Sequence, residues 1–267
     1  MRSVIREVYD GTRTPDQDSE DRFFTRVRLP TGVYKTTSRN RLDDLNELAA
    51  RLLPEVRPLE LMDVGISSGV TTSAWSDQLT AAGIPHRMVA GDSDLQAWWL
   101  SLGWAELLLD RDRKRVIYAD VLGRALTGGD SKKATLVARL LDFVARLISL
   151  LRPRLRQLQL VSPRLVETDA ITVVEDDIFT VAPQLRRRFH ALRAANILNR
   201  AYFDDERVRL GLVNLRDRLR PDGLLIVCRT HDDGTNHGTI FKLSDGRLTT
   251  VARLGEGSEI EDLVTSL

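Results

Sequence analysis

A short loop rich in glycine and serine follows an acidic residue in the stretch ELMDVGISSGVTT, residues 60–72. The apolar run before the loop ends at Asp63. Within the loop, Gly65, Ser67 and Gly69 stand at alternate positions. Glycines let a backbone approach a ligand closely, and the free N–H groups of a following helix attract negative charge. Strand, glycine loop and helix in this order predict a site for a nucleotide-like cofactor.

The elements that must position this loop alternate between strands and helices. The apolar pattern predicts strands within 60–64, 86–92, 170–179, 189–199 and 224–229, and helices within 41–53, 71–82, 95–102 and 204–223. Such alternation is typical of βαβ units on a parallel sheet. Two further strand-like runs, 238–242 and 248–253, are joined by Ser-Asp-Gly and predict an antiparallel hairpin at the sheet edge.

A second acid stands where a ribose-binding carboxylate is expected, at the end of the second strand. Asp92 follows the run HRMVAG and lies 20–30 residues after the glycine loop. The loop itself does not fit the dinucleotide pattern GxGxxG, because Ser67 and Val70 replace its second and third glycines. A tight turn that holds no ligand stays open as the alternative interpretation of the loop.

Three segments resemble class I S-adenosylmethionine (SAM)-dependent methyltransferases. MDVGISSG is similar to their motif I, an acid followed by GxGxG, with Ser67 in place of the middle glycine. VVEDDIF is similar to the segment after their third strand, which implies that Asp177 meets the adenine amino group and Ile178 packs on the ring. A solvated strand end is the alternative for this acidic run.

The third segment runs from RAANILNRAYF to LRPDGLLIV and resembles motif IV through the fifth-strand hairpin, with Asp222 replacing a glycine. It is distantly similar to the chemotaxis-receptor carboxyl methyltransferases. This implies that Asn196 lies near the methionine end of SAM. The resemblance covers roughly residues 55–102 and 168–253.

The resemblance implies a Rossmann-like α/β fold with a seven-stranded, mostly parallel sheet, an antiparallel C-terminal hairpin and a helical insertion. We expect an N-terminal helical or loop cap over residues 1–54 and a SAM-methyltransferase domain over 55–267. The insertion, 105–167, is predicted to contain a hairpin followed by an amphipathic helix. Because residues 131–156 carry seven Lys or Arg and one Asp, packing over a substrate pocket, a homodimer interface and contact with an anionic membrane all stay open.

Methyl transfer from a sulfonium is an in-line displacement that needs alignment rather than a covalent nucleophile. The only cysteine, Cys228, falls inside a predicted strand. The catalytic candidates follow the fourth and fifth strands; they are Asn196, Tyr202, Arg229 and His231. Arg229 and Arg200 suit a carboxylate or a phosphate, although a polar turn accounts equally well for any one of these residues.

The composition limits the kinds of partner and cofactor that we expect. The net charge of +1 gives no electrostatic reason to expect nucleic acid, and the single cysteine excludes a disulfide framework and a cysteine-based zinc site. No metal site is predicted. The N-terminus lacks a signal-peptide pattern, and no stretch reaches about 18 uncharged apolar residues. We therefore expect a cytoplasmic protein, and peripheral contact with a membrane stays open. The predicted function is SAM-dependent O- or carboxyl-methylation of an unidentified small or lipid-like molecule; the alternative is an inactive SAM-binding partner protein.

Overall fold

The computed structural model describes residues 3–11, 14–29, 34–35, 38–126 and 155–267. The chain divides into two compact units. We call Arg39–Ser93 with Thr168–Leu267 the α/β unit, and Met1–Ser38 with Asp94–Glu167 the antiparallel unit. Each unit is therefore assembled from two separate stretches of the sequence.

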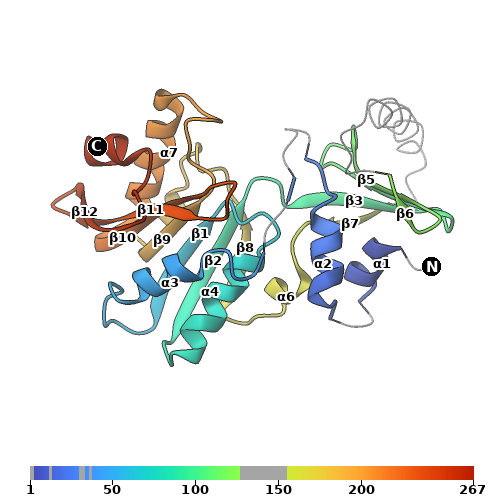
Figure 1. The fold of residues 1–267 in the computed structure, drawn as a ribbon, viewed down its shortest axis with the longest axis horizontal. Coiled ribbons are helices and arrows are strands. Elements are labelled where there is room, and N and C mark those ends of the chain that lie inside the picture. The colour runs from blue at the N-terminus through green and yellow to red at the C-terminus, as the bar shows by residue number, and fades with distance from the viewer. Residues whose placement is uncertain (1–2, 12–13, 30–33, 36–37, 127–154) are drawn as a thin grey trace. The chain divides into compact units, whose positions relative to one another are not determined.

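The α/β unit contains a mostly parallel sheet (Figure 1). Its strands are β1 (Leu59–Val64), β2 (His86–Asp92), β8 (Ile171–Glu175), β9 (Phe189–Ala195), β10 (Leu219–Thr230), β11 (Asn236–Ser244) and β12 (Arg247–Leu254). They lie in the order β12-β11-β10-β9-β1-β2-β8, and the five strands from β10 to β8 are parallel. Chain order reverses between β1 and β9, the switch point at which doubly wound sheets bind ligands beyond the carboxyl ends of the strands.

The last two strands, β11 and β12, run antiparallel to their neighbours. The predicted C-terminal hairpin is thereby confirmed. Its turn passes through Asp245 and Gly246, both left-handed (φ 52° and 79°), the conformation that a tight hairpin turn requires.

Helices lie on both faces of this sheet (Figure 1). On one face are α3 (Asp43–Ala50) and α4 (Val70–Ala81), and on the other are α7 (Asp205–Arg218) and α8 (Glu261–Thr265), with a short 3-10 turn, η2 (Pro183–Leu185), before β9. Successive side chains of β1 point to opposite faces of the sheet. Met62 and Val64 join the apolar core beneath α7 and α8, whereas Asp63 points to the face that α3 and α4 cover. The acid of the glycine loop is thus part of the packing between sheet and helices.

The antiparallel unit is built on a second sheet in the order β6-β5-β4-β3-β7. Its elements are α1 (Val4–Tyr9), α2 (Gln17–Phe24), β3 (Gln96–Ser101), β4 (Ala105–Leu109), β5 (Val116–Val121), β6 (Arg124–Ala125), β7 (Leu155–Gln159) and α6 (Pro163–Val166). Phe23 and Phe24 of α2 pack with Trp99 and Tyr118 of the sheet in one apolar core. The predicted hairpin at 105–123 is present as β4 and β5, in the middle of a larger sheet.

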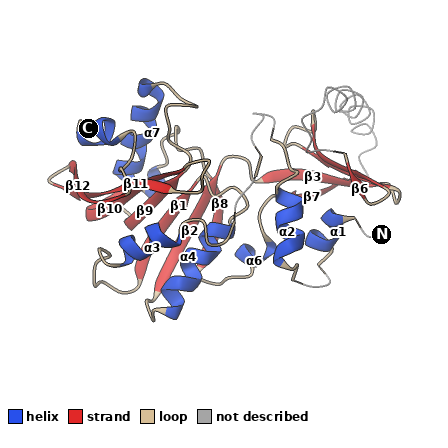
Figure 2. Cartoon of the chain, viewed as in Figure 1, coloured by secondary structure: helices blue, strands red, loops and turns tan. Residues whose placement is uncertain are grey.

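Two predictions need correction. Residues 95–102, predicted as a helix, contain strand β3 (Figure 2). Ala97 and Trp99 pack under α1 and α2 while Leu100 faces the opposite side of the sheet, so the apolar run is buried on two faces of a strand rather than along one stripe of a helix. The division of the chain also differs, because residues 1–38 group with 94–167, whereas residues 39–93, which include α3, group with 168–267. The amphipathic helix predicted over 131–152 lies outside the described residues.

Candidate functional site

The glycine loop connects β1 to α4 at the switch point of the sheet. Gly65, Ser67 and Gly69 are all left-handed, with φ of 67°, 58° and 80°. The loop is tied to β2, because the Gly65 N–H donates to the Gly91 carbonyl (2.8 Å). A Cβ on Gly65 would lie 2.6 Å from Cδ1 of Ile197, so glycine is favoured there by its conformation and because a side chain would force Ile197 to shift.

Asp92, the predicted ribose-binding acid, faces this loop. Its Oδ2 accepts a hydrogen bond from the Ser67 N–H at 2.7 Å, and the side chain is half-buried at the end of β2. A charged acceptor on a backbone N–H fixes the loop across the carboxyl ends of β1 and β2. Of the predicted cofactor residues, Gly65, Ser67, Gly69 and Asp92 are therefore brought together.

Asp63 lies beneath the loop and is engaged by the protein itself. Its carboxylate accepts from Arg193 Nε (3.0 Å) and Nη2 (2.5 Å) and from the Thr72 hydroxyl (2.7 Å). Arg193 also donates to Asn46 Oδ1 (2.6 Å), and its guanidinium lies 4.5 Å from the centre of the Trp75 ring. This carboxylate thus anchors the start of α4 to β9.

The acidic run after β8 is divided between a buried ion pair and an exposed turn. Asp176 is paired with Arg218 of α7 at 2.6 and 3.1 Å, with both side chains buried. Asp177, the predicted adenine partner, is exposed, and its Oδ1 accepts from the Phe179 N–H (2.9 Å). Ile178 is buried in the core beneath α7. Neither predicted adenine residue is brought to the glycine loop by a contact that the structure describes.

Asn196 links the ends of β9 and β10. Its Oδ1 accepts from the Thr230 N–H (2.7 Å), and its amide donates to the Thr230 hydroxyl (3.2 Å). The same hydroxyl donates to Asn236 and accepts from Arg41, which belongs to the segment before α3. Asn196 therefore joins this group of hydrogen-bonded side chains to β9. The next residue, Ile197, packs on Gly65.

The other catalytic candidates lie on the same edge but face different partners. Arg229 Nη1 donates to both carboxylate oxygens of Glu259, at 3.0 and 2.9 Å. His231 is exposed in a turn, and its ring lies 4.6 Å from that of His237. Tyr202 is 62% exposed. Of these side chains, the Arg229 guanidinium is held in a well-defined polar contact.

The titration of the cysteine bears on the chemistry of this edge. Burial, together with the charge of Asp44, raises the pKa of the Cys228 thiol to about 12. The thiolate is the nucleophilic form of cysteine. The Cys228 thiol is therefore buried and protonated near neutral pH.

A SAM molecule fits the residues around the loop in part. The Ser68 hydroxyl is fully buried in the loop and has no hydrogen-bond partner among the described residues. The Ser73 hydroxyl, in the first turn of α4, likewise lacks a partner there. Unsatisfied buried hydroxyls are costly, and a bound polar ligand is one way to satisfy them. The loop and Asp92 suit the cofactor, whereas Asp63 is already neutralised by Arg193.

Neither a metal centre nor a membrane-spanning helix is found among the described residues. No group of three or more His, Cys, Asp or Glu side chains is arranged to hold a metal ion in that part of the chain. No helix among the described segments is both long and apolar enough to cross a bilayer.

Sequence reasoning missed three residues that shape this site. Arg193 and Arg218 neutralise buried acids, and Glu259 pairs with Arg229. A charged residue inside the apolar strand FHALRAA was the available signal for Arg193, because a buried arginine requires a partner. Nothing in the sequence around Glu259 connects it with β10.

The chain matches no protein-family model and no curated protein. Among solved structures it is similar to the CMeT domain of citrinin polyketide synthase, with 14% identity over 85% of this chain and 42% of that one and a TM-score of 0.40. It is also similar to a Pyrococcus horikoshii OT3 protein, with 12% identity over 88% of this chain and 85% of that one and a TM-score of 0.40. A third is a putative O-methyltransferase from Nostoc punctiforme PCC 73102, with 14% identity, 72% and 39% coverage and a TM-score of 0.34. The chain spans less than half the length of the first and third of these structures, and methyltransferases recur among the similar structures, all at low sequence identity.

Proposed function

We propose that this protein binds SAM at the glycine loop and transfers its methyl group to the oxygen of a small or lipid-like acid. The observation that carries the proposal is the contact between Asp92 and the Ser67 N–H, which closes the loop at the switch point of the sheet. Bound SAM would supply the electrophilic methyl group. The left-handed loop and Asp92 are the residues that would hold it.

The chain's own contribution is orientation rather than covalent catalysis. Asn196 fixes the end of β9 against β10 through Thr230, and Arg229 presents a guanidinium one residue away on the same edge. An ionised acceptor needs no general base, and alignment with exclusion of water suffices to promote displacement. The burial of the Cys228 thiol, which raises its pKa, supports direct transfer over a cysteine-linked intermediate.

Isothermal titration calorimetry with S-adenosylhomocysteine tests the cofactor site. We expect binding by the wild type and a loss of at least about tenfold in affinity for Asp92→Ala, since one charge-assisted hydrogen bond contributes about 1.5–3 kcal/mol. Asp77→Ala, which removes an exposed acid on α4 that pairs with Arg39, serves as the matched control and should bind as the wild type does. Equal affinity of all three proteins would show that the ribose does not lie at Asp92.

A second candidate is a SAM-binding protein without transferase activity, and the ion pairs favour it. Asp63 is held by Arg193 and Arg229 by Glu259, so two charged candidates are already engaged within the protein. Incubation with tritiated SAM and a panel of carboxylic acids and phenols separates the two. Label in the acceptor supports the enzyme, whereas tight binding without transfer to any acceptor supports the binding protein.

A further inference from the structure

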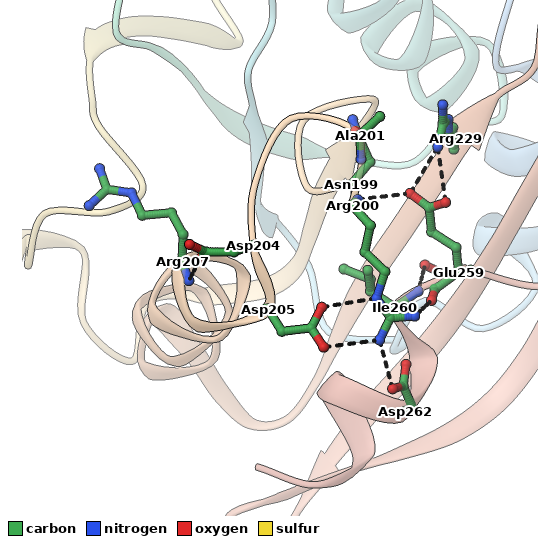
Figure 3. Close-up of polar contacts among 11 residues, drawn as sticks. Asn199, Arg200, Ala201, Asp204, Asp205, Arg207, Arg229, Glu259, Ile260 and Asp262 are labelled. Carbon is green, nitrogen blue, oxygen red and sulfur yellow. Dashed lines mark hydrogen bonds and ion pairs between the residues drawn. The ribbon is translucent and has the colours of Figure 1, made fainter.

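Glu259 fills a small anion-binding arrangement at the carboxyl edge of the α/β unit (Figure 3). Its two carboxylate oxygens accept from Arg229 Nη1 at 2.9 and 3.0 Å, and Oε1 also accepts from the backbone N–H of Arg200 at 3.2 Å. Arg229 is the penultimate residue of β10 and Arg200 lies in the loop after β9, so the two donors meet at the carboxyl edge of neighbouring parallel strands. A guanidinium and a backbone N–H that converge on one carboxylate are what an external carboxylate requires.

Arg200, which supplies the backbone donor, is held in place by contacts that do not involve the Glu259 side chain. Arg200 Nη1 donates to the Glu259 backbone carbonyl (2.6 Å), and its other nitrogens contact Asp205 (3.0 Å) and Asp262 (2.8 Å). These two acids raise the pKa of Arg200. The Ser258 N–H is also tied to the Thr239 hydroxyl (2.8 Å). Removal of the Glu259 carboxylate should therefore leave the Arg200 N–H in place, next to the Arg229 side chain at the end of the neighbouring strand.

The Glu259 carboxylate is accessible and weakly held. The Arg229 and Glu259 side chains are 36% and 33% exposed, and ion pairs at such positions contribute little because water competes for both groups. A carboxylate in solution, or on a bound molecule, can compete with a tethered one under these conditions.

The arrangement is also connected with the proposed cofactor loop. Thr230, next to Arg229, bonds to Asn196, and the following Ile197 packs against Gly65. We propose that Arg229 and the Arg200 N–H form a carboxylate-binding site, that Glu259 occupies it as an internal ligand, and that the carboxylate of the acceptor displaces Glu259 during turnover. The last step rests on the proposed function; the site itself does not.

Acetate is the probe for the site, and Glu259→Ala is the variant that vacates it. The thermal unfolding midpoint is followed during titration with sodium acetate, with sodium chloride at equal ionic strength as the reference. We expect an acetate-specific rise in the midpoint for Glu259→Ala, with an apparent affinity at least about tenfold above that of the wild type. The double variant Arg229→Met/Glu259→Ala should lose this response. Equal responses of the wild type and Glu259→Ala would overturn the proposal.

Glu259→Gln keeps the volume of the side chain and replaces the alanine variant if the latter does not fold. Its neutral amide pairs with Arg229 less strongly than a carboxylate does, so the same acetate-specific response is expected, and its absence would also overturn the proposal. The titration needs no cofactor. An acetate response without S-adenosylhomocysteine binding would support the site and refute the proposed function, whereas the reverse result would refute the site alone.

Discussion

Asp63 and Arg193 are direct partners in the register of the neighbouring parallel strands β1 and β9, and their side chains form a buried, two-contact ion pair. Only 3% of Asp63 and 1% of Arg193 is exposed. Such a pair compensates two desolvated charges, and neither group can be removed alone without leaving the other unpaired. The acid that precedes the glycine loop is therefore a structural anchor of the loop.

Replacement of Arg193 by methionine should destabilise the protein by about 3–5 kcal/mol, because Asp63 would be left buried without a counter-charge. Urea unfolding measures the change. The double variant Asp63→Asn/Arg193→Met should lose less than the sum of the two single variants, since no charge then stays unpaired. A loss below about 1 kcal/mol for Arg193→Met would contradict a buried pair.

Gly65→Ala should be more destabilising than Gly83→Ala. Both glycines are left-handed, with φ of 67° and 68°, but only Gly65 has a side chain against it, whereas nothing lies within 4 Å of a Cβ on Gly83. Conformation alone costs about 1–2 kcal/mol, and the contact with Ile197 adds about 1–3 kcal/mol. Urea unfolding of the two variants isolates the contact, and equal losses would show that Ile197 does not press on the loop.

Cys228 should be inert toward iodoacetamide in the native protein near neutral pH. Burial raises the pKa of its thiol to about 12 and also blocks access. Alkylation, followed by mass spectrometry, should accelerate only when urea unfolds the α/β unit. Rapid modification of the folded protein would mean that β10 opens readily.

Glu261 should stabilise the protein at neutral pH but not in strong acid. Hydrogen bonds from Arg253, Thr250 and Thr239 lower the pKa of Glu261 to about 2. Because this folded-state pKa lies below the unfolded value of about 4.3, the stabilisation is complete above about pH 5 and disappears as the pH falls toward 2. The difference in unfolding free energy between the wild type and Glu261→Gln should shrink over this interval.

The sequence was sufficient to predict the strands and loops that surround the switch point. Apolar runs that end in Asp63 and Asp92 are local patterns, and the structure places both acids at the loop. The strand at 96–101 was predicted wrongly because its two-faced apolar pattern, AWWL, becomes interpretable only when the antiparallel sheet is known. The local sequence pattern can predict that a strand or helix forms, but the neighbouring strands determine which of its faces are buried.

The polar contacts of the site were not predictable to the same degree. Asp63 and Arg193 are 130 positions apart and Arg229 and Glu259 are 30 apart, and register and loop closure alone bring each pair together. As a result, Asp63 and Arg229, which the sequence suggested as ligand-binding groups, each form an ion pair within the folded protein. The role of Asp177 and Ile178 toward adenine stays a prediction.

A crystal structure of the protein grown with S-adenosylhomocysteine tests the central claim most directly. The account predicts ligand density against the Gly65–Gly69 loop, with the ribose hydroxyls on the Asp92 carboxylate and Asp63 still paired with Arg193. Density at another position, or an empty loop at saturating ligand, would contradict it.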